Sequence, residues 1–87
     1  MIALYVTKTC PRCHQLASWL RQHDIAFEEK DMSQPEVRAE LLIDGVFELS
    51  APVLRVDEMW YPSGYLFPDG RMNESELNRI FMQEVNA

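Results

Sequence analysis

The stretch Thr9-Cys10-Pro11-Arg12-Cys13-His14 decides how the whole chain is interpreted. It contains the only two cysteines, three positions apart, between the apolar run 1–6 and a segment with helical periodicity. A Cys-x-x-Cys at a junction between a strand and a helix is typical of a dithiol redox site. If the helix begins at about Cys10, its free backbone N–H groups and its dipole stabilise a thiolate there. Cys13 then lies one turn further into the helix, close enough to close a disulfide.

This placement predicts different roles for the two cysteines. We expect Cys10, the more exposed one, to have a pKa below the ordinary thiol value of ~8.5 and to attack a substrate disulfide. Cys13 is expected to keep a higher pKa and to resolve the mixed disulfide. Pro11 fits the first helical position because its missing N–H is not needed there. Lys8 and Arg12 flank Cys10 and are expected to add positive potential.

Composition bounds the classes of protein that the chain can belong to. With 87 residues, 47% of them hydrophobic, we expect one small domain over 1–87. A net charge of −6 without a basic run argues against nucleic-acid binding. No stretch is long and apolar enough to span a membrane, and residues 1–6 do not read as a signal peptide. We therefore expect a cytoplasmic protein. In the cytoplasm a lone cysteine pair is more often catalytic or metal-binding than structural. We also expect the protein to be a monomer.

Hydrophobic periodicity predicts a series of short strands and helices. In the helix after the cysteines, a stripe that includes Leu16 and Leu20 is expected to be buried, with Trp19 at its edge. Ser33 followed by Glu36 is a capping-box pattern for the next helix. The predicted elements are strand 2–6, helix 11–23, strand 25–30, helix 34–43 with Gly45 as its stop, strands 53–56 and 59–61 around a tight turn, loop 62–71, and a last helix that starts near Asn73 and ends near Glu84.

The order β-α-β-α-β-β-α predicts an α/β fold with a four-stranded mixed sheet flanked by three helices. It resembles the glutaredoxin form of the thioredoxin fold over essentially the whole chain. Cys10-Pro11-Arg12-Cys13 resembles the Cys-Pro-Tyr-Cys of dithiol glutaredoxins, with Arg12 as a departure. Segment 50–53, Ser-Ala-Pro-Val, resembles the family's Thr-Val-Pro turn, whose proline follows a cis peptide bond. Segment 31–36 resembles the stretch between the family's second strand and second helix.

The resemblance implies a thiol–disulfide oxidoreductase, and we expect its substrate to be bound by residues around the cysteines, namely Lys8, Pro11, Arg12, Ala51, Pro52 and Gly64. Ala51 would pair its backbone with the substrate, and Pro52 would shape the groove beside the reactive cysteine. Gly64 stands alone where glutaredoxins usually have Gly-Gly followed by a polar or acidic pair that holds glutathione. Lys8 lies two residues before the first cysteine, whereas three is the usual offset in the family.

Segment 59–69 is more similar to the Trp-Ser-Gly-Phe-Arg-Pro element of redoxins that supply electrons to ribonucleotide reductase. Those redoxins are glutaredoxin-like in sequence but are reduced by thioredoxin reductase. The resemblance therefore implies a disulfide-containing protein partner, with ribonucleotide reductase as a candidate. We expect no bound cofactor, and either glutathione or a thioredoxin reductase as the external source of electrons.

Alternative interpretations of the same residues stay open. Cys10 and Cys13 could carry an iron–sulfur cluster or another metal, with His14 and His23 as further candidate ligands, although the spacing does not fit common zinc modules. The chain could also be a redox-inert interaction domain. Four aromatic residues form either an exposed docking patch beside the groove or part of the core, and they are Trp60, Tyr61, Tyr65 and Phe67.

Overall fold

Eight elements follow one another in the order β1-α1-β2-α2-β3-β4-α3-α4 in the computed structural model, which describes residues 1–47 and 50–82. The strands are β1 (Ile2–Val6), β2 (Glu28–Asp31), β3 (Val53–Val56) and β4 (Met59–Tyr61). The helices are α1 (Pro11–Gln22), α2 (Pro35–Ile43), α3 (Ser63–Leu66) and α4 (Glu74–Met82).

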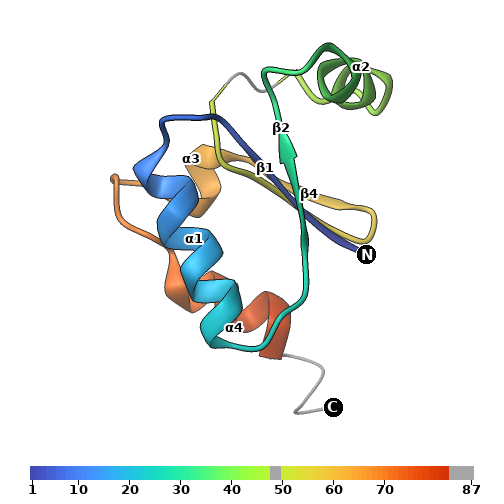
Figure 1. The fold of residues 1–87 in the computed structure, drawn as a ribbon. Coiled ribbons are helices and arrows are strands. Elements are labelled where there is room, and N and C mark those ends of the chain that lie inside the picture. The colour runs from blue at the N-terminus through green and yellow to red at the C-terminus, as the bar shows by residue number, and fades with distance from the viewer. Residues whose placement is uncertain (48–49, 83–87) are drawn as a thin grey trace.

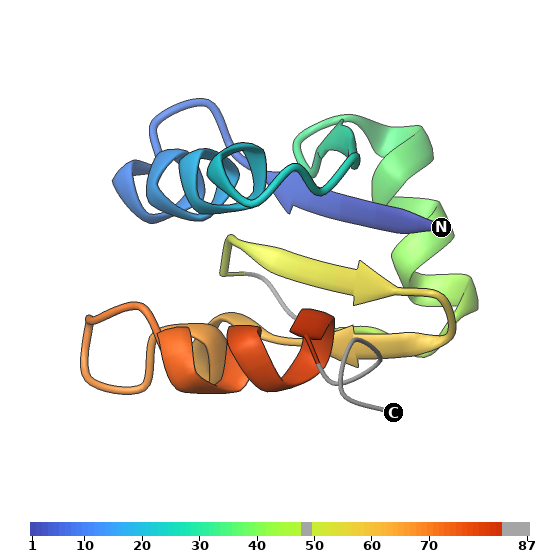
Figure 2. The ribbon, with the colours of Figure 1, turned by 90° about the horizontal axis from the view of Figure 1, so that it is seen from below.

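The four strands form one mixed sheet in the order β2-β1-β3-β4. β1 pairs parallel with β2, as expected for two strands joined by a helix, and antiparallel with β3. β3 and β4 form the predicted antiparallel hairpin around Asp57 and Glu58. Helices α1 and α4 lie side by side over one face of the sheet, and α2 covers the other (Figure 1, Figure 2). The predicted four-stranded sheet flanked by helices is therefore confirmed.

Alternation along β1 divides the core into two layers, because successive side chains of a strand point to opposite faces. Leu4 is fully buried and packs with Leu16 and Leu20 of α1 and Leu77 of α4. Its neighbour Tyr5 is equally buried but belongs to the cluster on the α2 face. The predicted stripe of α1 is thus confirmed, and the helix that begins with the two cysteines rests on the larger apolar layer.

The second strand begins later than the predicted residue 25. Ile25 donates its N–H to the carbonyl of Leu20 at 2.9 Å, which completes the end of α1 instead of a strand. Ile25 and Phe27 pack against the α1 face before the pairing with β1 starts at Glu28. The apolar alternation at 25–27 therefore marks the approach to the strand, and the strand itself runs through the charged residues 28–31.

The capping box predicted for α2 is wrong. Gln34 is the N-cap and its side chain makes no capping hydrogen bond, while Pro35 occupies the first turn. Ser33 instead donates from its backbone N–H and its hydroxyl to one carboxylate oxygen of Asp31, at 2.8 and 2.7 Å. The helix still begins within one residue of the prediction. Gly45, with a φ of +76°, ends it as expected, because only glycine adopts this conformation freely.

Three further details differ from the sequence prediction or lie beyond it. The segment predicted as loop 62–71 contains the short helix α3. Trp19 is buried instead of lying at the edge of its stripe, because it stacks on His23 and packs near Phe81 of α4. The predicted end of the last helix at Glu84 lies outside the described residues.

Within the two described segments, no helix has both the length and the apolar character needed to cross a membrane.

Candidate redox-active site

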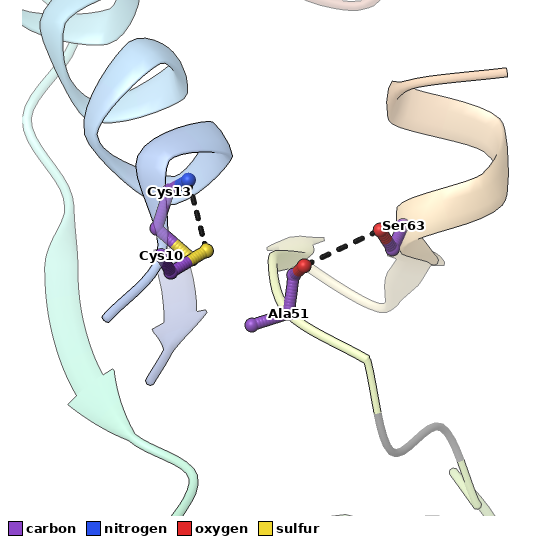
Figure 3. Close-up of a disulfide and its surroundings, with 4 residues drawn as sticks. All are labelled: Cys10, Cys13, Ala51 and Ser63. Atoms are coloured by element: carbon purple, nitrogen blue, oxygen red, sulfur yellow. Dashed lines mark hydrogen bonds between the residues drawn. A yellow bond between two sulfur atoms is a disulfide. The ribbon is translucent and has the colours of Figure 1, made fainter. Parts of the chain in front are cut away.

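The two cysteines lie where β1 passes into α1, and they are joined by a disulfide (Figure 3). The Cα atoms are 5.2 Å apart. Cys10 is the N-cap of α1, with Pro11 in the first turn. The backbone N–H of Cys13 donates to the sulfur of Cys10 at 3.1 Å. A helix N-terminus with a donor aimed at this sulfur favours negative charge on it, so the sequence places Cys10 where a thiolate is stabilised.

Cys10 opens onto a groove of about 710 Å³ beside the disulfide. Cys10 is 8% exposed and Cys13 is 4% exposed, and of the two only Cys10 lines this groove. The groove is lined by three segments that are distant in the sequence, and its lining residues are Thr7, Thr9, Cys10, Pro11, Arg12, Ser50, Ala51, Ser63 and Gly64. An incoming disulfide can therefore reach the first cysteine of the pair.

The turn before β3 forms the wall of the groove opposite the disulfide. The peptide bond between Ala51 and Pro52 is cis, as the resemblance predicts. The carbonyl of Ala51 accepts a hydrogen bond from the hydroxyl of Ser63 at 3.3 Å (Figure 3). A carbonyl oxygen can accept a second hydrogen bond, so Ala51 keeps acceptor capacity for another chain. Sequence reasoning missed Ser63, which is buried in α3 and lies in the segment predicted as a loop.

The residues predicted to bind substrate do not all line the Cys10 groove. Pro11, Arg12, Ala51 and Gly64 line the Cys10 groove, whereas Pro52 is fully buried behind it. Lys8 does not line this groove. It borders a second hollow, of about 470 Å³, on the other side of α1.

This second hollow contacts Cys13 and carries charges of both signs. It is lined by His14 and Arg21 on α1 and by Glu29 and Asp31 on β2, together with Lys8. Arg21 and Glu29 form an ion pair across it at 3.6 Å. The hydrogen bonds from Ser33 hold the pKa of Asp31 below its usual value, and the nearby Lys8 acts in the same direction. Lys8 therefore shares this hollow with acidic residues and does not line the Cys10 groove.

The set of four candidate metal ligands does not come together. His23 is the C-cap of α1, where its Nδ1 atom lies 2.8 Å from the carbonyl oxygen of Trp19. Cys10 caps the opposite end of this 12-residue helix, roughly 20 Å away along the axis at about 1.5 Å per residue. Within residues 1–47 and 50–82, no group of three or more His, Cys, Asp or Glu side chains could hold a metal ion.

The four aromatic residues do not form the single cluster considered from the sequence. Trp60 packs on the α2 face, 5.4 Å from the ring of Tyr5, whereas Tyr61 packs on the α1 face. The split follows from the alternation of side chains along β4. Tyr65 lies 5.4 Å from Tyr61, and Phe67 is buried beside the start of α1.

Comparison with known proteins finds relatives for most of this chain. The glutaredoxin family model matches residues 2–59, which include both cysteines and the Ala51–Pro52 turn but end before Ser63 and Gly64. The glutaredoxin-like protein NrdH of Lactococcus lactis subsp. lactis is 31% identical over 65 residues, or 75% of this chain and 88% of that protein.

Two other similarities are narrower. The global transcriptional regulator Spx of Streptococcus mutans is 37% identical over 43 residues, which is 48% of this chain but only 31% of that protein. The crystal structure of the thioredoxin-like protein BC3987 superposes with a TM-score of 0.72, covering 93% of this chain and all of the other. Its sequence identity is 22%, so this likeness shows the fold alone.

Proposed function

We propose, because the chain belongs to the glutaredoxin family, that it is a thiol–disulfide oxidoreductase working through Cys10 and Cys13. In the reduced protein, the Cys10 thiolate attacks one sulfur of a substrate disulfide and releases the other sulfur as a thiolate. A mixed disulfide now links Cys10 to the substrate. The Cys13 thiolate then attacks the Cys10 sulfur and releases the second substrate thiolate. Two electrons pass to the substrate, and the Cys10–Cys13 disulfide of the structure is the oxidised product.

One observation supports this assignment of roles above the others. The sulfur of Cys10 lies at the N-cap of α1, accepts the Cys13 N–H at 3.1 Å and borders the groove. Cys13 is less exposed and does not line that groove, but its sulfur is bonded to that of Cys10. An attacking group must be reachable by the substrate, whereas a resolving group only needs to reach its neighbour. The order of attack therefore runs from Cys10 to Cys13.

The Ala51 turn is proposed to hold the substrate in line for attack. A peptide that runs along the groove beside Ala51 can pair its backbone with this residue, as in strand addition at a sheet edge. Ser63 fixes the Ala51 carbonyl through its hydrogen bond and so keeps the turn in register with the disulfide. Holding the disulfide sulfurs close to Cys10 lowers the entropic part of the barrier.

Single substitutions of the two cysteines test this function. Cys10→Ser should abolish reduction of a protein disulfide and of bis(2-hydroxyethyl) disulfide, because no nucleophile remains in the groove. Cys13→Ser should trap a mixed disulfide whose mass equals that of the reduced protein plus one substrate thiol minus two hydrogens. Each variant is a control for the other, since both remove one sulfur from the same disulfide. Full activity of Cys10→Ser would contradict the mechanism, and a visible chromophore in freshly purified protein would favour cluster carriage.

The proposal also concerns the protein substrate and the electron donor. We propose ribonucleotide reductase as a substrate, because segment 59–69 resembles the matching element of redoxins that serve that enzyme and because relatives of this chain are named NrdH. Two coupled assays decide the donor: glutathione with glutathione reductase, and thioredoxin reductase alone, each following NADPH oxidation. Turnover with thioredoxin reductase only would place the chain with those redoxins, and turnover with glutathione only would contradict this.

A further inference from the structure

Arg12 is exposed on the rim of the Cys10 groove and contacts the loop that follows α3. Its guanidinium carbon lies 5.8 Å from the centre of the Phe67 ring, within the range of a cation–π contact. A Cβ atom added to Gly70 would come within 3.4 Å of Nη2 of Arg12, so the guanidinium also lies against the backbone of this loop. Phe67 is only 3% exposed and is held in the core. The loop that follows α3 therefore packs against the Arg12 side chain through Phe67 and Gly70.

The charge of Arg12 has no counterpart within the described residues. Of the seven other lysine and arginine side chains, four lie within 4 Å of a carboxylate (Arg21, Lys30, Arg55 and Arg79), and the other three form no ion pair among the described residues. Arg12 forms no ion pair in segments 1–47 and 50–82, and the lining of its groove in those segments includes no acidic residue. The hollow on the other side of α1 differs, because Glu29 and Asp31 line it.

The position of Arg12 is also unfavourable for the helix itself. It lies in the first turn of α1, which has no acidic residue, where the positive end of the helix dipole disfavours a cation. A local arrangement that costs stability is expected where it serves binding. The chain as a whole has a net charge of −6 and repels anions. The positive charge of Arg12 instead favours the binding of a negatively charged group in this groove.

We propose that Arg12 selects disulfides that carry a carboxylate next to the cysteine attacked by Cys10. A guanidinium binds a carboxylate through two parallel hydrogen bonds, and its support on Phe67 reduces the freedom lost on binding. The carboxylate can belong to an acidic residue of a protein substrate or to the glycine end of glutathione. This inference deepens the thiol–disulfide exchange proposed above and rests on it.

Matched substrates and variants measure this selectivity. The probes are cyclic peptides with one intramolecular Cys-x-x-Cys disulfide and Glu, Gln or Lys before the first cysteine. A second pair is glutathione disulfide and its glycyl ethyl ester. We expect wild-type kcat/KM to favour the Glu over the Gln peptide by about two- to fivefold, as for one exposed charge pair, with Lys lowest. Arg12→Gln should bring this ratio close to one, and high salt should reduce it.

Two further variants separate selectivity from general effects. Arg12→Lys should leave an intermediate ratio, because it keeps the charge but loses the planar fork. Arg38→Gln removes the same charge from the exposed surface of α2 and should leave every ratio unchanged. Loss of a cation near Cys10 can alter the rate on all substrates, and the ratio between substrates cancels this effect.

The outcomes distinguish the two proposals. A preference for the Glu peptide that depends on Arg12 identifies a carboxylate of a protein substrate. A preference for glutathione disulfide over its ester that depends on Arg12 identifies the glycyl carboxylate. Each of these results supports the inference. Equal rates on the Glu and Gln peptides together with equal rates on glutathione disulfide and its ester would overturn it, as would charge preferences that survive in Arg12→Gln. In those cases the exchange function stands. If no disulfide is reduced at all, both proposals fail.

Discussion

The two faces of the sheet are held by different forces. On the face covered by α1 and α4, Leu4 is fully buried against Leu20 and Leu77 in an apolar layer. The face covered by α2 combines a smaller apolar cluster, which includes Tyr5 and Trp60, with the charged side chains of Lys30 and Glu40. Because Cys10 and Cys13 begin α1, the candidate site rests on the apolar face. We therefore expect the site to depend on buried area, and the attachment of α2 to depend on charge and on pH.

The charged side chains on the α2 face meet at Glu40. The hydroxyl of Tyr5 donates to one of its oxygens at 2.9 Å, and Nζ of Lys30 donates to both at 2.8 and 3.0 Å. Lys30 also lies 5.8 Å from the centre of the Tyr5 ring. One strand further, the guanidinium of Arg55 lies 4.9 Å from the ring of Trp60. Since Tyr5 is fully buried, its hydroxyl depends on the partner that α2 brings.

The largest effect is expected from a cavity on the apolar face. Leu20→Ala should lower the free energy of unfolding by about 3 kcal/mol, because it removes a fully buried side chain between α1 and the sheet. Urea unfolding of the oxidised protein measures this. Leu42→Ala is the matched control on α2, where the side chain is 55% exposed, and should change stability by less than about 0.5 kcal/mol. Similar losses in both variants would contradict the expectation that the buried area of Leu20 holds α1 on the sheet.

A smaller loss is expected when the network on the α2 face is broken. Glu40→Ala leaves the buried Tyr5 hydroxyl without its acceptor, and among the described residues the longer contact with Glu28 at 3.4 Å is then the remaining ion pair of Lys30. We expect a loss of about 2 kcal/mol in the free energy of unfolding, since one unsatisfied buried donor costs about 1–3 kcal/mol. Arg38→Ala, on the exposed side of the same helix, should cost less than about 0.5 kcal/mol. An equal effect of both variants would show that the network contributes nothing.

The same network predicts how stability responds to pH. The hydrogen bond from Lys30 lowers the pKa of Glu40 from its usual 4.5, so this contribution is present above 4.5 and is lost as the pH falls below it. The bond to Glu40 raises the pKa of Lys30 from 10.5, so its contribution is present below that value and is lost at higher pH. Burial and the bond to Glu40 raise the pKa of Tyr5 from 10.0, with the same sign as for Lys30.

Comparison with Glu40→Gln isolates this effect from other titrating groups. The stability difference between wild type and variant should be constant from about pH 5.5 to 9.5 and should shrink outside this window on both sides. Urea titrations of the oxidised proteins at about ten pH values measure it. A difference that does not depend on pH would mean that Glu40 acts through packing and not through charge.

The apolar face was largely predictable from the sequence, whereas the α2 face was not. Leu16 and Leu20 follow helical spacing after the cysteines, and this local pattern is enough to assign the helix and its buried side. Tyr5 and Glu40 are 35 positions apart, and nothing in either neighbourhood indicates that they form a hydrogen bond. Periodicity reports which side of an element is buried, but not which polar groups meet across it.

The candidate site shows the same division. The Cys-Pro-x-Cys spacing and the Ala51–Pro52 turn predict two walls of the groove, because each is a local motif. The third wall comes from Ser63 and Gly64, and the role of Ser63 depends on a hydrogen bond to a residue 12 positions earlier. Lys8 is near Cys10 in sequence, yet it lines the second hollow and not the groove, and closeness in the sequence does not show which of the two hollows a residue borders.

The smallest effect is expected from an exposed ion pair at the edge of the apolar face. Arg21 and Glu29 lie 3.6 Å apart, with side chains 65% and 50% exposed. Water screens such a pair, so Arg21→Gln should change the free energy of unfolding by less than about 0.5 kcal/mol, despite the contact of Arg21 with the Phe27 ring. Urea unfolding at low and high salt measures this. If Arg21→Gln destabilised the protein as much as Glu40→Ala, charge would matter equally on both faces, and the contrast between an apolar and a charge-dependent layer would fail.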